Sequence, residues 1–486
     1  MLQRALLLLG LALCGPADAA APPQIDLTAT PAWKGWSRPG RPSEVDIRLS
    51  TDAATAATVE VVAGRQSVYT ELDLQPGRTV RLHVPVGPAA RVVVSVRPST
   101  GATQRRELIL LQSESPLLGV GLAAGGPVQL DGFHAVALTA DDLPRNASAY
   151  SSIDALVLDA STLRALDQRQ LAALLGRSAS CGRIVVVNTD PQVRRLLDGS
   201  GECGGQTLMS ADTASDALEL LESSLAHARP QPMASGGIGE LMGADRAAWN
   251  GVVVALAMCF AATALVLMFT SQMSVLLLTP ALCAVAAMVL LHVVKPPAQL
   301  VVWSEGASGA QLARYQAWHQ FPGAVRERTR MRIPPQLAAN VQPCDATLDL
   351  RFGFDARSGQ AMFAEFETRL FRQVSLCYSG SFPMARAIAI EARSDTVREV
   401  RNTGPKAWPQ GKLLLEGRVH ELPSLGPGAH VTLSASGGHP PDAAVQRLAM
   451  MRVQPDKVAA LWPLELGGVS DIPADSRAWL LVTAPP

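Results

Sequence analysis

The chain has 486 residues, and its 42 Lys and Arg balance 42 Asp and Glu, so its formal net charge at neutral pH is zero. A chain without a bulk positive field is not expected to recruit nucleic acid. The length suits about three domains. A composition of 39 Gly and 35 Pro with 5% aromatic residues favours short strands joined by turns.

Residues 1–19 have the pattern of a secretory signal peptide. Arg4 supplies the positive charge, residues 5–14 are apolar, and Ala17-Asp18-Ala19 forms a small-residue cleavage site. The apolar stretch is too short to cross a bilayer. We therefore expect the mature chain to be exported.

Residues 22–114 predict a β-sandwich. Apolar and polar residues alternate in 45–49, 58–61, 80–84, 91–96 and 107–111, and turn signals such as Pro76-Gly77 separate these runs. About seven short strands with this spacing are typical of an immunoglobulin-like sandwich. Because such folds host many functions, the fold alone predicts none.

Residues 115–229 predict an α/β domain. Short apolar runs at 117–122, 134–139, 155–159 and 183–188 are interspersed with helical patterns at 162–176 and 213–228. Short buried strands that alternate with helices are typical of a parallel sheet with helices on its faces.

The same segment resembles a known domain family. The resemblance is carried by Leu143-Pro144, by the run from Tyr150 to Leu158, by Leu166, Gln170 and Leu171, and by the run from Cys181 to Val186. It is similar to the class I glutamine-amidotransferase-like domain of uncharacterised bacterial membrane proteins of the cell envelope. That family usually has two glycines before the fourth strand, where this chain has Cys181-Gly182. The resemblance implies a structural rather than a catalytic domain.

Neither a catalytic site nor a cofactor is predicted in this segment. An amidotransferase needs a nucleophilic Cys in a sharp turn with a His as base, and Cys181 and Cys203 lie in polar, Gly-rich loops instead. Gly119 and Gly121 loosely match a dinucleotide-binding fingerprint, but Gly125-Gly126-Pro127 breaks the helix that would receive the pyrophosphate. We expect the chain not to be an enzyme.

Residues 230–247 predict a linker, and 248–270 and 273–294 predict two transmembrane helices. Neither helix contains Asp, Glu, Lys or Arg, and each has the roughly 20 residues that a bilayer core requires. Together with the signal peptide, the hairpin predicts a protein of the bacterial inner (cytoplasmic) membrane. Both large domains would then lie on the periplasmic side, with the lipid bilayer as one partner.

Residues 296–486 predict a β-rich exported domain, with candidate strands at 300–303, 325–333, 348–354, 387–392, 413–415, 431–434 and 478–482. Its four histidines, His319, His420, His430 and His439, are too widely spaced for a metal-ligand motif. No metal site is therefore predicted.

Four cysteines outside the signal peptide and the predicted spans form two pairs. Cys181 and Cys203 precede the predicted hairpin, and Cys344 and Cys377 follow it. In an oxidising compartment such even pairs favour the disulfides Cys181–Cys203 and Cys344–Cys377. The alternative is that they are free, buried thiols.

Arginine occupies every second position near the start of the C-terminal domain, at Arg326, Arg328, Arg330 and Arg332. Because side chains alternate faces along a strand, all four guanidinium groups are predicted on one face, with Met331 and Ile333 turned to the core. An anionic lipid or polymer would relieve their mutual repulsion. The alternative is a solvated edge strand whose arginines prevent pairing with other sheets.

The predicted function is that of a non-catalytic, membrane-anchored protein of the cell envelope whose exported domains bind partner proteins or surface polymers. Two alternatives remain open at the level of sequence: an accessory subunit of an envelope transport or polymer-export complex, and a divergent amidotransferase-like hydrolase.

Overall fold

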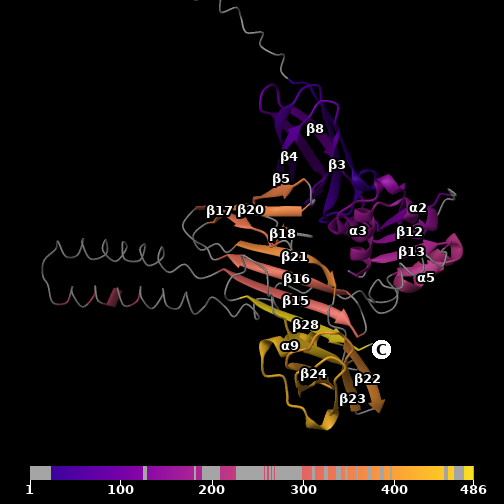
Figure 1. Cartoon of the computed structure of the whole chain (residues 1–486), viewed down its shortest axis with the longest axis vertical. Coiled ribbons are helices and arrows are strands. Elements are labelled where there is room, and N and C mark those ends of the chain that lie inside the picture. Colours follow the sequence, from indigo (N-terminus) through magenta and orange to yellow (C-terminus); the bar gives the residue numbers. More distant parts are fainter. Residues whose placement is uncertain are drawn as a thin grey trace, which may run out of the picture.

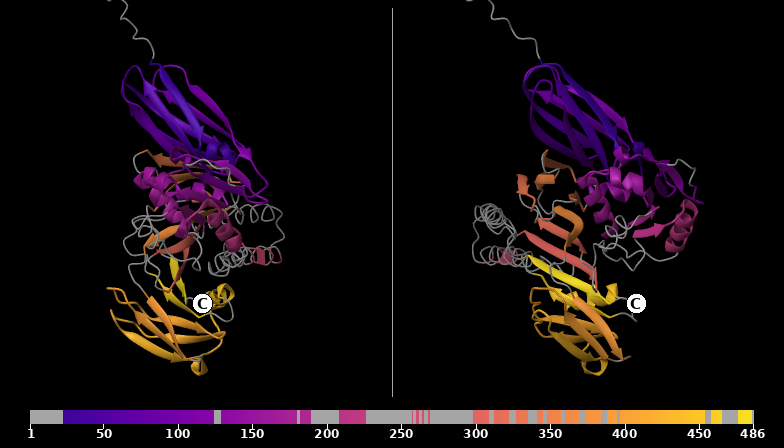
Figure 2. Two further views of the ribbon diagram at one scale, coloured as in Figure 1. Left: turned by 90° about the vertical axis from the view of Figure 1, so that its right-hand side faces the viewer. Right: turned by 45° about the vertical axis from the view of Figure 1, so that its right-hand side comes forward.

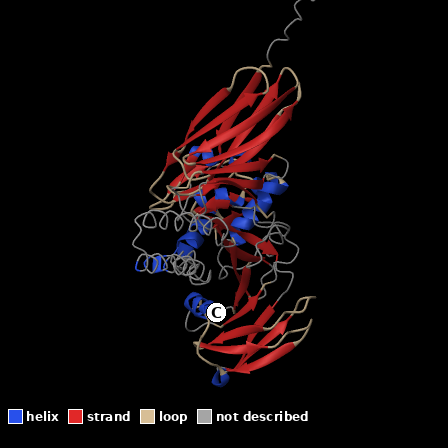
Figure 3. Ribbon diagram, turned by 90° about the vertical axis from the view of Figure 1, so that its left-hand side faces the viewer, coloured by secondary structure: helices blue, strands red, loops and turns tan. Residues whose placement is uncertain are grey.

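A computed structural model describes residues 23–123, 129–179, 182–188, 208–225 and, apart from gaps, 298–484. The gaps are 309–311, 322–326, 335–340, 345–347, 357–359, 369–373, 384–387, 395–396, 454–457 and 465–475, and five single residues between 257 and 268 are also described. The N-terminal body lies at the top of Figure 1 and the C-terminal body extends to the bottom, with a further body of parallel strands and helices beside them at mid-height. Strands dominate each of the views (Figures 1–3).

The N-terminal body is a sandwich of two sheets. One consists of β1 (Ile25–Pro31), β3 (Ser43–Thr51) and β6 (Val80–Val86), which pair antiparallel in the order β1-β3-β6. The facing sheet contains β4 (Thr55–Ala63), β5 (Gln66–Leu74), β7 (Arg91–Pro98) and β8 (Gln104–Ile109). Buried positions alternate along β3 and β4, so each strand turns one face to the shared core.

Strands from the far end of the chain extend the facing sheet. β17 (Glu327–Arg332), β20 (Gln360–Thr368) and β19 (Leu350–Asp355) complete the order β17-β20-β19-β5-β4-β7-β8. β19 lies parallel to β5, with Gly353 opposite Tyr69. One apolar core includes both Val61 of β4 and Phe352 of β19. Residues 22–114 and 296–486, which the sequence analysis treated as separate domains, therefore share a sheet and a core.

A second body contains five parallel strands. They are β10 (Leu117–Gly121), β11 (His134–Ala137), β12 (Ala155–Asp159), β13 (Arg183–Val187) and β14 (Leu208–Ala211), in the order β11-β10-β12-β13-β14. The helices α2 (Ala160–Ala165) and α3 (Gln168–Ala179) contribute to the core on one face, and α5 (Ala214–Leu225) to the core on the other.

The buried side chain of Trp33 joins the sandwich to this second body. It lies in the short helix η1 (Ala32–Gly35), where the φ of Trp33 is 55°, and its indole Nε1 donates to the carbonyl oxygen of Ala149 at 3.0 Å. Its ring meets Tyr150 edge-on, 5.1 Å between centroids, in η3 (Ala147–Ser152). The two-residue strands β2 (Trp36–Ser37) and β9 (Leu111–Gln112) pair beside it, and η2 (Ala140–Asp142) precedes η3.

The C-terminal body is an eight-stranded sheet with a small sheet beside it. The order is β18 (Val341–Pro343), β21 (Val374–Pro383), β16 (Leu312–Phe321), β15 (Gln299–Ala307), β28 (Arg477–Thr483), β27 (Ala459–Pro463), β24 (Gly411–Leu415) and β25 (Arg418–Leu422). The small sheet consists of β22 (Ile388–Ser394), β23 (Val397–Asn402) and β26 (His430–Ser434), followed by η5 (Ala435–Gly437). The helix α9 (Ala444–Arg452) packs on the opposite face of the large sheet from the small one.

The fold class that the sequence predicted is wrong. Of the described chain, 54% is strand and 18% is helix. These proportions conflict with a fold defined by an amidotransferase-like α/β domain and a two-helix membrane anchor. The longest described helices, α3 and α5, have 12 residues each. A helix needs about 20 residues to cross a bilayer core, and no described helix is long and apolar enough to do so.

The predicted inner-membrane location is corrected for the same reason, because the described part of the chain offers no membrane-spanning helix. The segments 248–270 and 273–294 themselves lie outside the described residues, apart from five single positions. The signal peptide 1–19 and the linker 230–247 also lie outside them.

The shared core predicts that damage to β19 destabilises the N-terminal sandwich. Phe352 is 4% exposed in that core, and replacing it with alanine is expected to cost about 3–5 kcal/mol of unfolding free energy. Hydrogen exchange of the β4 and β5 amides should accelerate accordingly.

The matched control is Met362→Ala on the adjacent strand β20, where the side chain is 44% exposed and the expected change lies within about 0.5 kcal/mol. Unchanged protection of β4 and β5 in Phe352→Ala would contradict a shared core.

Candidate functional site

The predicted arginine strand lies at an open edge. β17 is the last strand in the order of the seven-stranded sheet, and Arg328, Arg330 and Arg332 are exposed while Met331 is half-buried against the core. Arg326 lies outside the described residues. The three described arginines therefore share one solvent-facing side of the strand.

The backbone N–H and C=O groups of β17 point alternately toward β20 and away from the sheet. The N–H of Ile333 donates to the carbonyl of Met362 at 2.8 Å, and Arg332 lies opposite Phe363 in the antiparallel register. Alternate residues of an antiparallel strand bond to the same neighbour. The odd-numbered residues thus bond to β20, and the N–H and C=O groups of the three arginines point away from the sheet.

Glu365 connects the arginine strand to its neighbours. It lies opposite Arg330 across β17 and β20 and opposite Arg351 across β20 and β19. The Nε of Arg330 is 3.4 Å from Oε1 of Glu365, and the hydroxyl of Tyr69 donates to the same oxygen at 2.8 Å. Burial and this hydrogen bond to Glu365 raise the pKa of Tyr69, so the phenol stays protonated as a donor.

Two aromatic rings hold the guanidinium groups in place. Arg330 stacks over Phe363 at 4.2 Å and Arg351 over Tyr69 at 4.3 Å. Gly353 lies between the rings, where an added Cβ would be 3.2 Å from Phe363 Cδ2 and 3.3 Å from the Tyr69 hydroxyl oxygen. We call this surface the arginine face; its residues are Glu60, Tyr69, Arg328, Arg330, Arg332, Arg351, Gly353, Phe363 and Glu365.

Sequence reasoning missed the half of the arginine face that lies outside β17. Tyr69 belongs to β5, and Glu60 of β4 pairs with Arg351 at 3.5 Å. Alternation indicates which residues of a strand face solvent, but it does not indicate which strands become neighbours. Nothing in the local sequence places Tyr69 beside residues about three hundred positions away, as its contact with Glu365 does.

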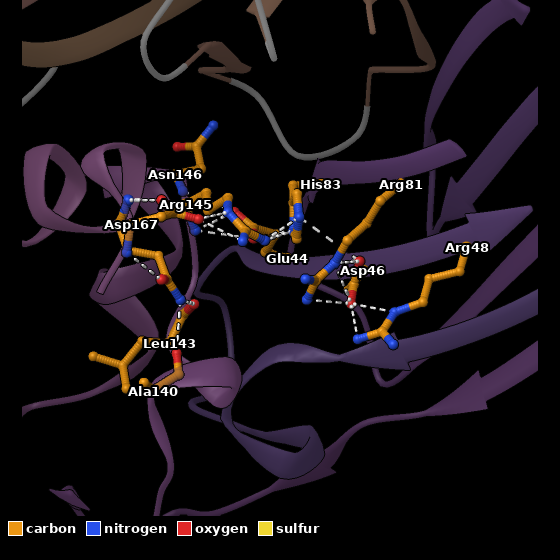
Figure 4. A network of polar contacts seen from close by, with 11 residues as sticks. Glu44, Asp46, Arg48, Arg81, His83, Ala140, Leu143, Arg145, Asn146 and Asp167 are labelled. Atoms are coloured by element: carbon orange, nitrogen blue, oxygen red, sulfur yellow. Dashed lines mark hydrogen bonds and ion pairs between the residues drawn. The ribbon is translucent and has the colours of Figure 1, made fainter. Parts of the chain in front are cut away.

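A second polar cluster joins the sandwich to the parallel-sheet body (Figure 4). The Glu44 carboxylate, almost fully buried, accepts from the backbone N–H groups of Arg145 at 3.0 Å and Asn146 at 2.8 Å. Its Oε1 lies 3.3 Å from Nδ1 of His83, and the Arg145 guanidinium contacts both His83 and Asp167. These contacts fasten the two bodies to each other.

The Asp159 carboxylate has a structural role in the parallel-sheet body. Asp159 caps α2 by accepting from the N–H of Thr162 at 2.7 Å, and it also accepts from Ser161 Oγ at 2.8 Å. Burial alone raises the pKa of Asp159, but the backbone hydrogen bonds from Thr162 and Ala123 outweigh it and lower that pKa. A carboxylate held in this way is a weak base, so the Ser161–Asp159 contact is a helix cap rather than a catalytic pair.

Glu305 of β15 is a buried carboxyl whose pKa is strongly lowered by its partners. It accepts from Trp303 Nε1 at 2.9 Å and from Arg452 Nε at 2.7 Å, and it pairs with Arg314. Burial alone raises its pKa, but the hydrogen bond from Arg452 and the charges of Arg314 and Arg452 lower it to about 2. Because Arg452 ends α9, this ion pair fastens the helix to the sheet.

The structure describes His319 and two of the four cysteines that the sequence analysis paired. His319 is buried, which lowers its pKa to about 4 and keeps it neutral. The described residues contain no group of three potential metal ligands. A disulfide joins Cys344 to Cys377, 5.1 Å between Cα atoms, beside the pairing of β18 with β21.

Cys181 and Cys203 lie outside the described residues, so their pairing stays a prediction. Sequence reasoning also passed over the flanks of Cys203. Gly201 and Gly205 stand two residues to either side of it, a spacing that suits a sharp nucleophile turn. This segment, too, lies outside the described part of the chain.

A cavity at the junction of the bodies is too small for a ligand. It measures about 40 Å³ and is lined by residues that include Pro42, Pro85, Asn146 and Phe352. A water molecule needs about 10–15 Å³ by the same kind of measure, so the space suits a few waters at most.

No protein-family model matches the chain, and no curated protein matches it. The yeast delta-COP-I mu-homology domain complexed with a Dsl1 WxWxV peptide is 6% identical over 39% of this chain and 96% of that domain, with a TM-score of 0.18. A Paenibacillus sp. cycloisomaltooligosaccharide glucanotransferase complexed with cycloisomaltoheptaose is 12% identical over 33% of this chain and 27% of that enzyme, with a TM-score of 0.17. At TM-scores this low, neither similarity carries an argument about fold or function.

The Glu305 cluster predicts a loss of stability in acid. Because the folded pKa of about 2 lies below the ordinary value of 4.5, the stabilisation is fully present above pH 4.5 and is lost as the pH falls toward 2. The loss should amount to roughly 3 kcal/mol. Urea unfolding of Glu305→Gln, measured across this range, should give a lower stability at pH 7 and a weaker dependence on pH.

The exposed Glu71 of β5 provides the control, since Glu71→Gln should keep the acid dependence of the parent. An equally steep acid dependence in Glu305→Gln would show that other carboxylates carry it.

Proposed function

We propose that the protein is a non-catalytic binding protein that holds an acidic polymer on the arginine face. The observation that carries this proposal is the alignment of Arg328, Arg330 and Arg332 on the exposed side of an open edge strand. In a chain with no net charge, this grouping is a local feature rather than a consequence of an overall positive charge.

Preorganised guanidinium groups favour binding of an anion. Arg330 is held between Glu365 and the ring of Phe363, and Arg351 between Glu60 and the ring of Tyr69. Binding of a ligand carboxylate to such a group costs less conformational entropy, because the arginine side chain is already held in one orientation. Arg328 is exposed and lies opposite Glu367 across β17 and β20, at the outer end of the same row of arginines.

The shape of the face suits an extended ligand. Consecutive arginines on one side of a strand are about 7 Å apart, so a chain that carries regularly spaced carboxylates can contact several at once. The outward N–H and C=O groups of Arg328 and Arg330 add hydrogen-bonding positions along the same line. A surface polymer of uronic acids has this chemistry, and an acidic segment of a partner protein is the competing ligand.

The proposal predicts that binding of alginate by the full-length protein depends on the arginines. The triple variant Arg328→Gln/Arg330→Gln/Arg332→Gln should bind about tenfold more weakly at low salt, roughly 0.5 kcal/mol for each arginine. Binding by the parent should also weaken between about 20 mM and 300 mM salt because exposed charges are screened. Isothermal titration calorimetry gives both quantities.

The opposite edge of the same sheet supplies a matched control. Arg105 and Arg106 on β8 are exposed, so the variant Arg105→Gln/Arg106→Gln removes charge from an edge without touching the arginine face. Equal weakening in both variants, or no binding of alginate by the parent, would refute the proposal. Binding of poly-L-glutamate but not alginate would assign the face to an acidic protein segment instead.

A further inference from the structure

A pocket of about 370 Å³ opens beside α9. This helix belongs to the C-terminal body and lies on the far side of the molecule from the sandwich (Figure 1). Its volume falls in the range of roughly 300–1,000 Å³ that is usual for small-molecule sites. The strands β24, β25, β27 and β28 and the first turn of α9 contribute its lining, which includes Lys412, Glu421, Gln446, Pro463 and Trp479. None of these residues belongs to the arginine face.

Gln446 is the buried polar side chain of this pocket. It is 5% exposed, and its Oε1 accepts from the backbone N–H groups of Asp442 at 3.0 Å and Ala443 at 3.4 Å. These two donors fix the orientation of the amide, because only its oxygen can accept from them. The Nε2 group is consequently turned the other way, and no described residue accepts a hydrogen bond from it.

The Nε2 group is not closed off from solvent, so its two N–H bonds can donate to water or to a ligand in the pocket. Since Gln446 lines the pocket, a ligand oxygen placed there would replace water as the acceptor of these N–H groups. The amide therefore points to a ligand with hydrogen-bond acceptors rather than to a purely apolar one.

The charges of the lining cancel. The Lys412 ammonium donates to the Glu421 carboxylate, and Nε2 of His439 lies 3.6 Å from the same oxygen. The hydrogen bond from Lys412 lowers the pKa of Glu421, so the carboxylate stays ionised at neutral pH. The two charges of this pair offset each other, and a neutral polar ligand can hydrogen-bond to its remaining lone pairs and protons.

The rest of the lining is an apolar wall with an aromatic side chain. Trp479 is half-buried and lies opposite Pro463 across β27 and β28, and Leu461 continues the wall. An indole presents a flat, apolar surface with a negative π-face, which attracts weakly positive C–H groups. One wall of the pocket is thus apolar, and Gln446, Lys412 and Glu421 supply polar groups around it.

We infer that this pocket binds a neutral sugar residue, with an axial C–H face of the ring against Trp479 and ring hydroxyls on Gln446, Lys412 and Glu421. A pyranose is the common neutral molecule with an apolar face and a rim of hydroxyl groups. Its hydroxyls both donate and accept, so one residue can satisfy the Gln446 amide and the Lys412–Glu421 pair together. The inference is independent of the proposed function of the arginine face.

Calorimetric titration of the full-length protein tests this inference. The probes are neutral trisaccharides of glucose, galactose, mannose and N-acetylglucosamine, with the corresponding monosaccharides as a second arm. We expect at least one trisaccharide to bind, with a change in tryptophan fluorescence. Tighter binding of the trisaccharide than of its monosaccharide would assign the pocket to a polysaccharide chain, and equal affinity to a free sugar.

The discriminating variant is Gln446→Glu. Glutamate keeps the oxygen that caps α9 and the shape of the side chain, but it loses the Nε2 donor, so binding should weaken at least tenfold with little change in thermal stability. Arg447→Gln, at the next and exposed position of the same helix, should bind like the parent.

Two outcomes would overturn the inference. One is that none of the four trisaccharides binds at 20 mM or below. The other is that a sugar binds with unchanged affinity to Gln446→Glu, which would place it elsewhere on the protein. If the triple arginine variant keeps the sugar affinity of the parent, the pocket and the arginine face bind their ligands independently.

Discussion

The parallel pairing of β19 with β5 is the contact on which the arrangement of this protein depends. The N–H of Leu350 donates to the carbonyl of Arg65 at 3.1 Å, and four residue pairs follow in register from Leu350 opposite Gln66. Without that pairing, β5 would be an open edge at the end of the N-terminal sandwich. With it, strands from residue 327 onward complete the sheet, and one apolar core contains both Val45 and Phe366.

A sheet built from distant segments has consequences for the surface as well as for the core. Side chains on the outer face come from β5 and β4 on one side of the junction and from β19, β20 and β17 on the other. The contacts Tyr69–Glu365 and Glu60–Arg351 cross this junction. The arginine face therefore exists only when both segments are folded together, and its binding function is tied to the integrity of the junction.

Some polar side chains of the molecule have their partners within the chain, and others face a pocket. The clusters around Glu44 and Glu305 bind charged partners within the chain, and both join separate elements. Such satisfied clusters fasten a structure and leave little for a ligand. Gln446 differs because only its oxygen has partners among the described residues, and it borders a pocket rather than an interface.

The sequence by itself located individual strands and the composition of their faces. Alternation in 45–49 and 80–84 corresponds to β3 and β6, and the arginine spacing placed Arg328, Arg330 and Arg332 on one side of β17. These features are local, because successive side chains of any strand point to opposite faces. The apolar content of 248–294 led to a fold class and a location that the described structure contradicts, because no described helix is long and apolar enough to cross a bilayer.

Tertiary structure alone decided which strands became neighbours. Pairing β19 with β5 brings Arg351 beside Tyr69, and the pairing of β24 with β27 and of β27 with β28 assembles the pocket that Gln446 borders. Backbone hydrogen bonds can form between almost any two strands, so the sequence of one strand does not specify its partner. The partner is selected by burial of a common core, which is a property of the whole chain, and for this reason both candidate sites became visible only in the folded molecule.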